Sequence, residues 1–153
     1  MTKNVLTRTI MAVLAGGIVL ATGACSLFSG PQYRDANGLV TASAAINNTQ
    51  LQVGDCIVNV SNMTDQVTKI DVVPCDVQHE GEVFAIGQSL SNDDTTLSGY
   101  CTDQFEGYVG IPWANTNLKA TYFHAASGDT TDVQCVVYNT GVMVTTSYKD
   151  SQQ

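Results

Sequence analysis

Basic residues are scarce in this chain, which has 6 lysines and arginines against 14 aspartates and glutamates and a formal net charge of −8. An acidic surface repels nucleic-acid phosphates and anionic lipid headgroups. The chain also lacks the spacings of common metal and redox sites: no two cysteines lie closer than 19 positions, and there is no HExxH pair or acidic calcium loop. We therefore expect no nucleic-acid partner and no cofactor.

Long apolar runs are missing as well. The uncharged run Ile10–Ala21 has 12 residues, about 18 Å of helix, which is short for a hydrocarbon core of about 30 Å. It follows the basic residues Lys3 and Arg8, an arrangement typical of an export signal.

Small residues follow this run. The segment "LATGACS", Leu20–Ser26, resembles the bacterial lipobox, whose cysteine receives a diacylglyceryl group and an acyl chain such as palmitate, although Thr22 stands where lipoboxes usually carry Leu. The resemblance implies removal of a signal peptide, residues 1–24, and lipidation of Cys25, which would anchor the protein on the extracytoplasmic face of the plasma membrane. The alternative is a signal peptide cleaved near this site with Cys25 left unmodified.

Cleavage changes both the charge and the cysteine count. Residues 1–24 contain two basic residues and no acid, so their removal lowers the net charge from −8 to −10. With Cys25 lipidated, four cysteines remain, and in an exported chain this even number predicts two disulfides, with three connectivities that spacing does not separate. These cysteines are Cys56, Cys75, Cys101 and Cys135.

The folded domain is expected at residues 51–148. Residues 25–50, rich in small and polar side chains, are expected to form a flexible tether, and residues 149–153 a tail. Apolar residues spaced by three and four from Leu97 predict a helix that ends at Gly110. Strands are expected within 53–60, 66–73, 82–87, 118–125, 132–139 and 142–148, with hairpins joining the first two and the last two. The predicted fold is α+β: a small, disulfide-stapled antiparallel sheet of five or six strands with one main helix.

The expected secondary structure favours one disulfide connectivity. The first hairpin brings Cys56 near Cys75, and Cys101 on the apolar face of the helix points toward the strand that carries Cys135. Each closure is expected to add about 2–4 kcal/mol of stability by restricting the unfolded chain.

Cys75 and His79 raise a question of chemistry, because they are four residues apart beside two glutamates. Nucleophilic catalysis is disfavoured, since residues four apart meet reliably only on a helix and Pro74 precedes a turn-like segment. A metal site drawing on His79, Glu82 and His124 has acceptable ligand types at unspecific spacing. The remaining interpretation is a structural histidine that braces a corner of the chain.

Four segments, "VGDCI", "VVPCDVQHEGEVFAIG", "YCTDQFEGYVG" and "CVVYN", together resemble the septum formation domain of actinobacterial envelope proteins over Val53–Asn139. The "VPCxxxHxxEVF" element is the specific part. The resemblance implies structural cysteines, a structural motif containing His79 and Glu82, and a membrane-anchored protein near the division apparatus. The chain departs from the family before its last cysteine, where Thr130 replaces an Arg and a Trp is missing.

These observations give two functional expectations. The first is a non-enzymatic, lipid-anchored cell-envelope protein, a binding or structural module linked to septum formation or cell division, with Trp113 as the candidate contact to an envelope or division protein. The alternative is a small metal-dependent or hydrolytic envelope enzyme that uses His79, Glu82 and His124 in one cleft. That alternative requires the two histidines to lie close together.

Overall fold

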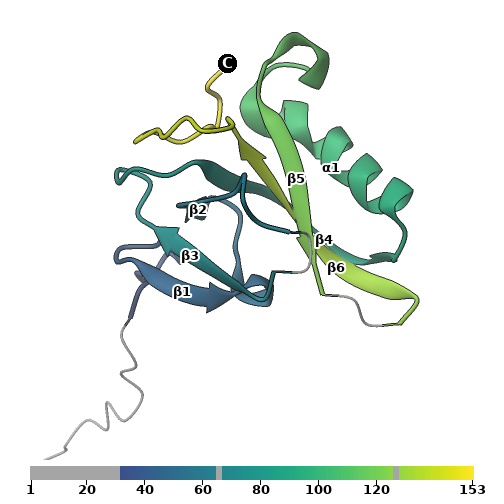
Figure 1. Ribbon diagram of the computed structural model, residues 1–153, viewed down its shortest axis with the longest axis horizontal. Coiled ribbons are helices and arrows are strands. Elements are labelled where there is room, and N and C mark those ends of the chain that lie inside the picture. Colours follow the sequence, from purple (N-terminus) through teal and green to yellow (C-terminus); the bar gives the residue numbers. More distant parts are fainter. Residues whose placement is uncertain (1–31, 65–66, 126–127) are drawn as a thin grey trace, which may run out of the picture. The chain divides into compact units, whose positions relative to one another are not determined.

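A computed structural model describes residues 32–64, 67–125 and 128–153, which form one antiparallel sheet and one long helix (Figure 1). The strands are β1 Ala44–Asn47, β2 Cys56–Ile57, β3 Lys69–Val73, β4 Gly81–Ser91, β5 Lys119–His124 and β6 Thr130–Tyr138, in the spatial order β1-β3-β2-β4-β6-β5. Helix α1 spans Asp94–Val109, and short 3-10 turns occupy Asn48–Gln50 (η1) and Trp113–Asn115 (η2). The predicted α+β fold with a sheet of five or six strands is therefore confirmed.

Residues 1–24 and Cys25 lie outside the described residues, so the predicted signal peptide and lipidation site stay predictions. Among the residues that are described, no helix has the length and apolar character needed to cross a bilayer.

Helix α1 begins and ends at residues that suit those positions. The side chain of Asp93 accepts a hydrogen bond from the Thr96 backbone N–H at 2.9 Å, which satisfies one of the free donors of the first turn. Gly110 ends the helix, as the sequence predicts, in the left-handed conformation at φ 88°, and its N–H donates to Glu106 O. The buried face consists of Leu97, Cys101, Phe105, Tyr108 and Val109.

The alternation of side chains along β6 supplies two cores. Val133, Cys135 and Val137 pack with the buried face of α1, whereas Val136 faces a second cluster. This second cluster contains side chains from every strand of the sheet. The sheet is therefore curved, and the half formed by β1, β3 and β2 packs its buried side chains against those of β4, β6 and β5 (Figure 1). Register shifts in β4, between Val83 and Ala85 and again after Gly87, supply irregularities of the kind that bend a strand.

Two disulfides join these layers, with the connectivity that the expected secondary structure favours. Cys56 on β2 is bonded to Cys75 just after β3, with Cα atoms 5.3 Å apart. Cys101 on α1 is bonded to Cys135 on β6, with Cα atoms 5.5 Å apart, and so holds the helix against the sheet.

The predicted tether, residues 25–50, is wrong for its described part. Residues 44–47 form β1 and pair with β3, and Arg34 and Val40 form an isolated bridge upstream. Ile46 lies in the second core. The domain therefore begins before residue 51. The sequence shows no sign of this because an edge strand buries only every second side chain, so a segment with few apolar residues can still form one.

The C-terminal expectations also need correction. Residues 142–148 do not form a strand in a hairpin with β6, because both edges of β6 are already occupied, by β4 and β5. The segment instead crosses to the start of β4, where Val144 makes a two-residue bridge with His79. The expected tail, 149–153, packs against the end of α1, where Asp150 N donates to Tyr108 O at 2.9 Å and Gln152 N donates to Val109 O at 3.0 Å.

The strand predicted at 53–60 is reduced to the two residues of β2. A turn precedes β2, with Asp55 N donating to Gln52 O at 3.1 Å and Gly54 at φ 92°. The sequence predicted a longer strand because β-branched residues are frequent here, and their frequency alone does not reveal the turn that interrupts the strand.

Candidate functional site

His79 lies in the corner between β3 and β4 and is fully buried, with 0% of its surface exposed. Its backbone N–H donates to Val144 O at 2.9 Å and its carbonyl accepts from Val144 N at 2.8 Å. The ring atom Nδ1 lies 2.8 Å from Val77 O, and the ring meets Tyr148 edge to face with centroids 6.4 Å apart. Backbone and ring together therefore join the corner to the C-terminal segment.

Glu80, the next residue, is a buried carboxylate that joins two loops to the start of β4. One of its oxygens accepts from Val60 N at 2.6 Å and from Ser61 N at 2.9 Å, and the other accepts from Gly141 N at 2.9 Å. Burial opposes ionisation, but these hydrogen bonds outweigh it and lower the pKa of Glu80 below its ordinary value. Glu80 is thus an ionised acceptor for backbone donors.

Glu82, two residues after Glu80 and within β4, is a second buried carboxylate that accepts several hydrogen bonds. Its carboxylate accepts from the Tyr108 hydroxyl at 2.7 Å, from Ser147 Oγ at 2.7 Å and from Tyr148 N at 2.6 Å. Burial, followed by the hydrogen bond to Glu82, raises the pKa of Tyr108 well above its ordinary value, so this hydroxyl stays a donor. Glu82 therefore joins β4, the end of α1 and the C-terminal segment.

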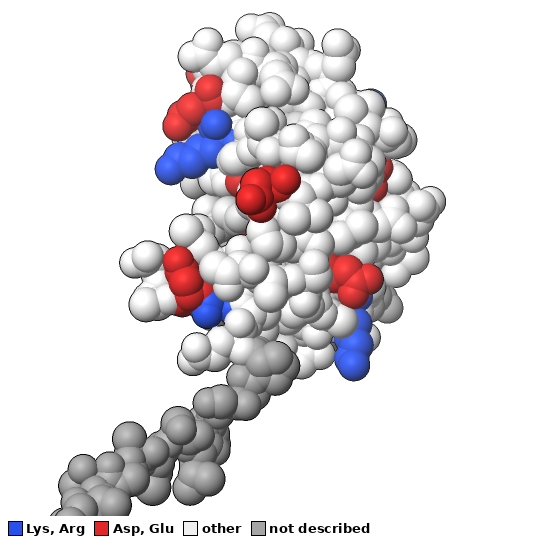
Figure 2. Space-filling view, turned by 90° about the vertical axis from the view of Figure 1, so that its left-hand side faces the viewer, with Lys and Arg blue, Asp and Glu red and all other residues white. Residues whose placement is uncertain are grey.

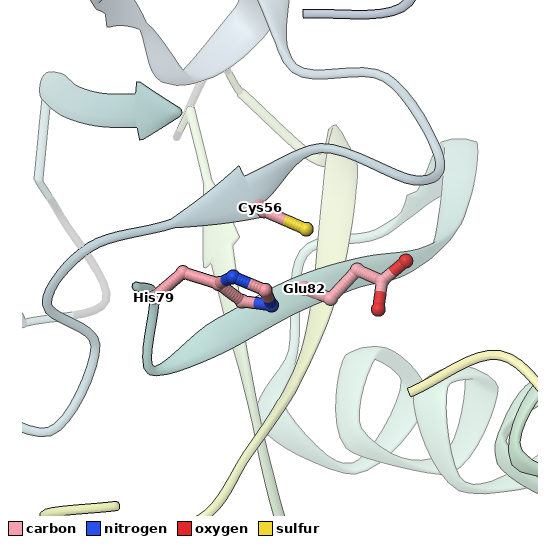
Figure 3. A group of neighbouring side chains, drawn as sticks. All are labelled: Cys56, His79 and Glu82. Carbon is pink, nitrogen blue, oxygen red and sulfur yellow. The ribbon is translucent and has the colours of Figure 1, made fainter. Parts of the chain in front are cut away.

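Cys56, His79 and Glu82 lie together, although the sequence separates Cys56 from the other two (Figure 3). The antiparallel register places Cys56 opposite Glu82, which puts their side chains on the same face of the sheet. The Cys56 sulfur, one ring nitrogen of His79 and one carboxylate oxygen of Glu82 all lie within 4.8 Å of one another. In the oxidised protein this sulfur belongs to the disulfide with Cys75, and a disulfide sulfur is not the thiolate that binds metals.

His124 is not part of this group. Along the β4-β6-β5 sheet, Gly81 pairs through Tyr138 with Lys119 at one end, and Gly87 pairs through Val133 with His124 at the other. At about 3.3 Å per residue, these ends are about 17–20 Å apart, and His79 precedes Gly81. His79, Glu82 and His124 therefore do not share one cleft, contrary to the arrangement that the alternative function requires.

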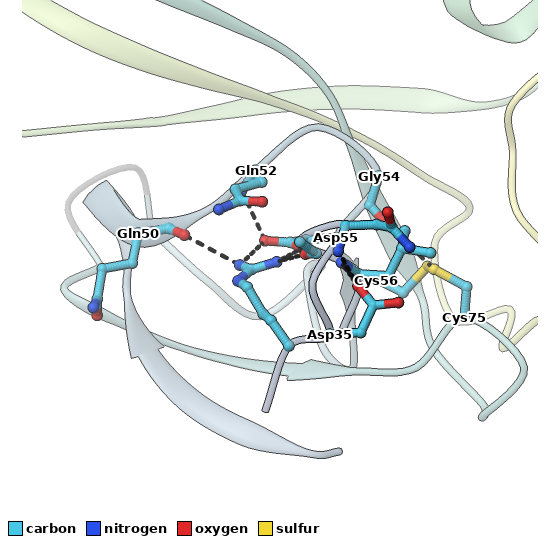
Figure 4. A network of polar contacts seen from close by, with 11 residues as sticks. Asp35, Gln50, Gln52, Gly54, Asp55, Cys56 and Cys75 are labelled. Atoms are coloured by element: carbon cyan, nitrogen blue, oxygen red, sulfur yellow. Dashed lines mark hydrogen bonds and ion pairs between the residues drawn. A yellow bond between two sulfur atoms is a disulfide. The ribbon is translucent and has the colours of Figure 1, made fainter. Parts of the chain in front are cut away.

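An ion pair that the sequence did not predict fastens the N-terminal segment (Figure 4). Both guanidinium nitrogens of Arg34 donate to the Asp55 carboxylate at 2.6 Å, and Arg34 also donates to Gly38 O and Gln50 O. The hydrogen bond to Asp55, the largest influence, raises the pKa of Arg34. Arg34 is the only basic residue between Cys25 and Lys69, and this isolation is the one sequence signal that marked it.

An open groove of about 620 Å³ lies near this ion pair, and Cys75 of the Cys56–Cys75 disulfide forms part of its wall. Its apolar wall includes Leu39, Pro74 and Val77, and two of these side chains are well exposed, Leu39 at 59% and Val77 at 44%. Asp35 and Asp76 also line it, and none of the described residues along it is a lysine or an arginine. The groove is thus an exposed apolar surface with acidic residues beside it.

Trp113, the candidate contact from the sequence, lies elsewhere. It begins η2, is 37% exposed, and packs edge to face on Phe105 of α1 with ring centroids 4.9 Å apart. This side chain therefore takes part in the packing around α1, and it does not line the groove beside Cys75.

The chain was compared with protein-family models, curated proteins and solved structures, and none of the three comparisons found a match.

Proposed function

We propose that this protein is a lipid-anchored cell-envelope module, without an enzymatic reaction of its own, that binds a protein partner through the groove beside Cys75 and acts near the site of septum formation. The anchor rests on the lipobox-like segment around Cys25, and the septum link rests on the resemblance of the "VPCxxxHxxEVF" element.

The observation that carries the binding role is the exposed apolar wall of the groove. Exposed large apolar side chains that gather in a concave surface are typical of interaction sites, whereas single ones are common on any protein. Leu39 and Val77 come from segments far apart in the sequence and line the same groove. The Cys56–Cys75 disulfide and the Arg34–Asp55 ion pair hold segments of its wall in place, so little ordering entropy is lost on binding.

Charge selects the occupant. Asp35 and Asp76 line the groove, and none of the described residues in its wall is basic. Figure 2 shows one face of the domain, on which acidic and basic side chains are scattered over a largely uncharged surface. The ligand that fits is a protein segment with an apolar side chain for the groove and a lysine or arginine beside it for the carboxylates.

Site-specific photo-crosslinking in the native host tests this binding. A photoreactive amino acid at Val77 is expected to trap a discrete protein partner, whereas the same group at Thr102, exposed on α1, is expected to trap none. Leu39→Asp should abolish the product formed from Val77, and Asp76→Lys should reduce it, at unchanged melting temperature. Equal products from both positions, or a product indifferent to both substitutions, would refute the groove as the binding site.

Separate measurements test the anchor and the location. Cys25→Ser should prevent labelling with a palmitate analogue and release the protein from membranes. A fluorescent fusion should concentrate at division septa, and a uniform distribution along the envelope would remove the septum link while leaving the groove untouched.

A further inference from the structure

The cluster of Cys56, His79 and Glu82 contains a buried ring nitrogen, His79 Nε2, to which the described part of the chain supplies no donor. Nδ1 of His79 lies 2.8 Å from the carbonyl oxygen of Val77 and donates to it, so in the neutral imidazole Nε2 presents a lone pair. Nε2 is buried and has no hydrogen-bond partner among the described residues. Its neighbours in the cluster are a carboxylate and a sulfur, neither of which brings a proton to it. A cation would satisfy this lone pair and the carboxylate together.

We propose that opening of the Cys56–Cys75 disulfide converts this cluster into a zinc site, with Cys56 Sγ, His79 Nε2 and a Glu82 carboxylate oxygen as ligands. The three groups are the sulfur, nitrogen and oxygen ligands that Zn²⁺ accepts, and three protein ligands leave the fourth tetrahedral position to water. This metal site goes beyond the partner binding proposed above and does not depend on it.

The surroundings are those of metal ligands in proteins. The other ring nitrogen of a ligating histidine usually donates to a carbonyl, as Nδ1 does to Val77 O here, and ligating carboxylates are themselves hydrogen-bonded, as Glu82 is to Tyr108 and Tyr148. In tetrahedral zinc sites sulfur and nitrogen ligands lie about 3.5 Å apart, from Zn–S and Zn–N distances of about 2.3 and 2.0–2.1 Å. The cluster, with separations up to 4.8 Å, must contract by about 1 Å, which the freed Cys56 side chain allows.

Charge balance favours the ion. Opening the disulfide leaves a potential thiolate at Cys56 beside the Glu82 carboxylate, and two buried negative charges in contact are unfavourable. Zn²⁺ neutralises both. The proton of the Cys56 thiol leaves to solvent when the metal binds.

The chemistry that opens the bond is supplied by a dithiol reductant. Its thiolate attacks Cys75, the more accessible sulfur, which lines the groove, and Cys56 leaves as the thiolate inside the cluster. The second thiol of the reductant then displaces Cys75, so the reductant ends as a disulfide and the protein gains two electrons and two protons. Gly54 O lies 3.4 Å from Cys75 Sγ and can accept from the new thiol.

A matched pair of substitutions tests the site without any reductant. Cys75→Ser leaves the Cys56 thiol beside His79 and Glu82, whereas Cys56→Ser loses the same cross-link and leaves a thiol on the groove side. Cys75→Ser is expected to bind one Zn²⁺ per chain at least 100-fold more tightly than Cys56→Ser. With Co²⁺ in place of Zn²⁺, only Cys75→Ser should show thiolate-to-metal charge-transfer absorption, and Cys75→Ser with His79→Gln should lose tenfold or more in affinity.

Equal weak binding by the two single variants would identify adventitious surface sites and overturn the proposal. If neither variant folds, the wild type answers the question: after mild phosphine reduction, Zn²⁺ should protect Cys56 from alkylation while Cys75 stays reactive, as read by peptide mass spectrometry. Equal alkylation of Cys56 with and without Zn²⁺ would overturn the proposal as well.

Discussion

Glu82→Gln is the sharpest test of how the C-terminal segment is held. The substitution keeps the size of the side chain and removes the charge that three donors share: the Tyr108 hydroxyl, the Ser147 hydroxyl and the Tyr148 N–H. The two hydroxyls can rotate and accept from the new amide, but the backbone N–H of Tyr148 cannot. The amide oxygen is therefore expected to turn toward Tyr148.

The expected cost follows from the change in hydrogen-bond strength. Hydrogen bonds to a charged group contribute about 1.5–3 kcal/mol and neutral ones about 0.5–1.5 kcal/mol, so three bonds lose about 3 kcal/mol together. Relief of the desolvation of a buried charge offsets part of this loss. We expect the free energy of unfolding to fall by about 2 kcal/mol, equivalent to a decrease in melting temperature of about 6–12 °C for a domain of this size.

Denaturant unfolding of the oxidised protein and amide hydrogen exchange measure the two parts of this prediction. Protection of the Tyr148 amide should fall more than protection of amides in β6. Asp103→Asn, an exposed change of the same charge on α1, is the control and should stay within about 0.5 kcal/mol of wild type. A Glu82→Gln protein with wild-type stability and unchanged Tyr148 protection would refute the role assigned to the buried charge.

Three further predictions concern the other buried polar groups. Arg34→Met should lower the free energy of unfolding by about 3–5 kcal/mol in urea titrations because it leaves Asp55 buried and unpaired, and adding Asp55→Leu should restore part of the loss. The folded-state pKa of Glu80 is lowered, so Glu80 contributes its full stability at pH values above 4.5, its unfolded pKa, and loses this contribution as the pH falls through the folded-state pKa. Glu80→Gln should therefore reduce the loss of stability at acidic pH in a plot of stability against pH. An unchanged loss would contradict this role. The folded-state pKa of Tyr108 is raised above 10.0, so stability should decline as pH rises past 10.0, and Tyr108→Phe should weaken that decline in melting curves at alkaline pH.

Several features of the fold could be read from the sequence because their signals are local. The spacing of Leu97, Cys101 and Phe105, with Gly110 behind them, specifies a helix and its end. The even number of cysteines after Cys25 predicts two disulfides, and the strand pattern favours the pairs that the structure contains. Each of these inferences depends on residues within a few positions of one another or on simple counting.

The two ends of the domain could not be read in this way. Residues 32–50 depend on the ion pair of Arg34 with Asp55, which are 21 positions apart, and nothing near either residue indicates the other. The segment 142–148 has a strand pattern, but the neighbours of β6 had already been fixed by β4 and β5. Which edge of a sheet remains open is a property of the whole topology.

The candidate site shows the same division. The sequence placed His79 and Glu82 together because they are three positions apart, and it grouped His124 with them on residue type alone. Only the strand register moved His124 to the far end of the sheet and brought Cys56 opposite Glu82. The partners of the buried carboxylates are largely backbone N–H groups, which every residue except proline carries, so the sequence around Val60, Gly141 or Tyr148 contains no sign of these contacts. The sequence therefore determined the local elements and the cross-links, and tertiary structure determined which backbone donors meet the buried charges.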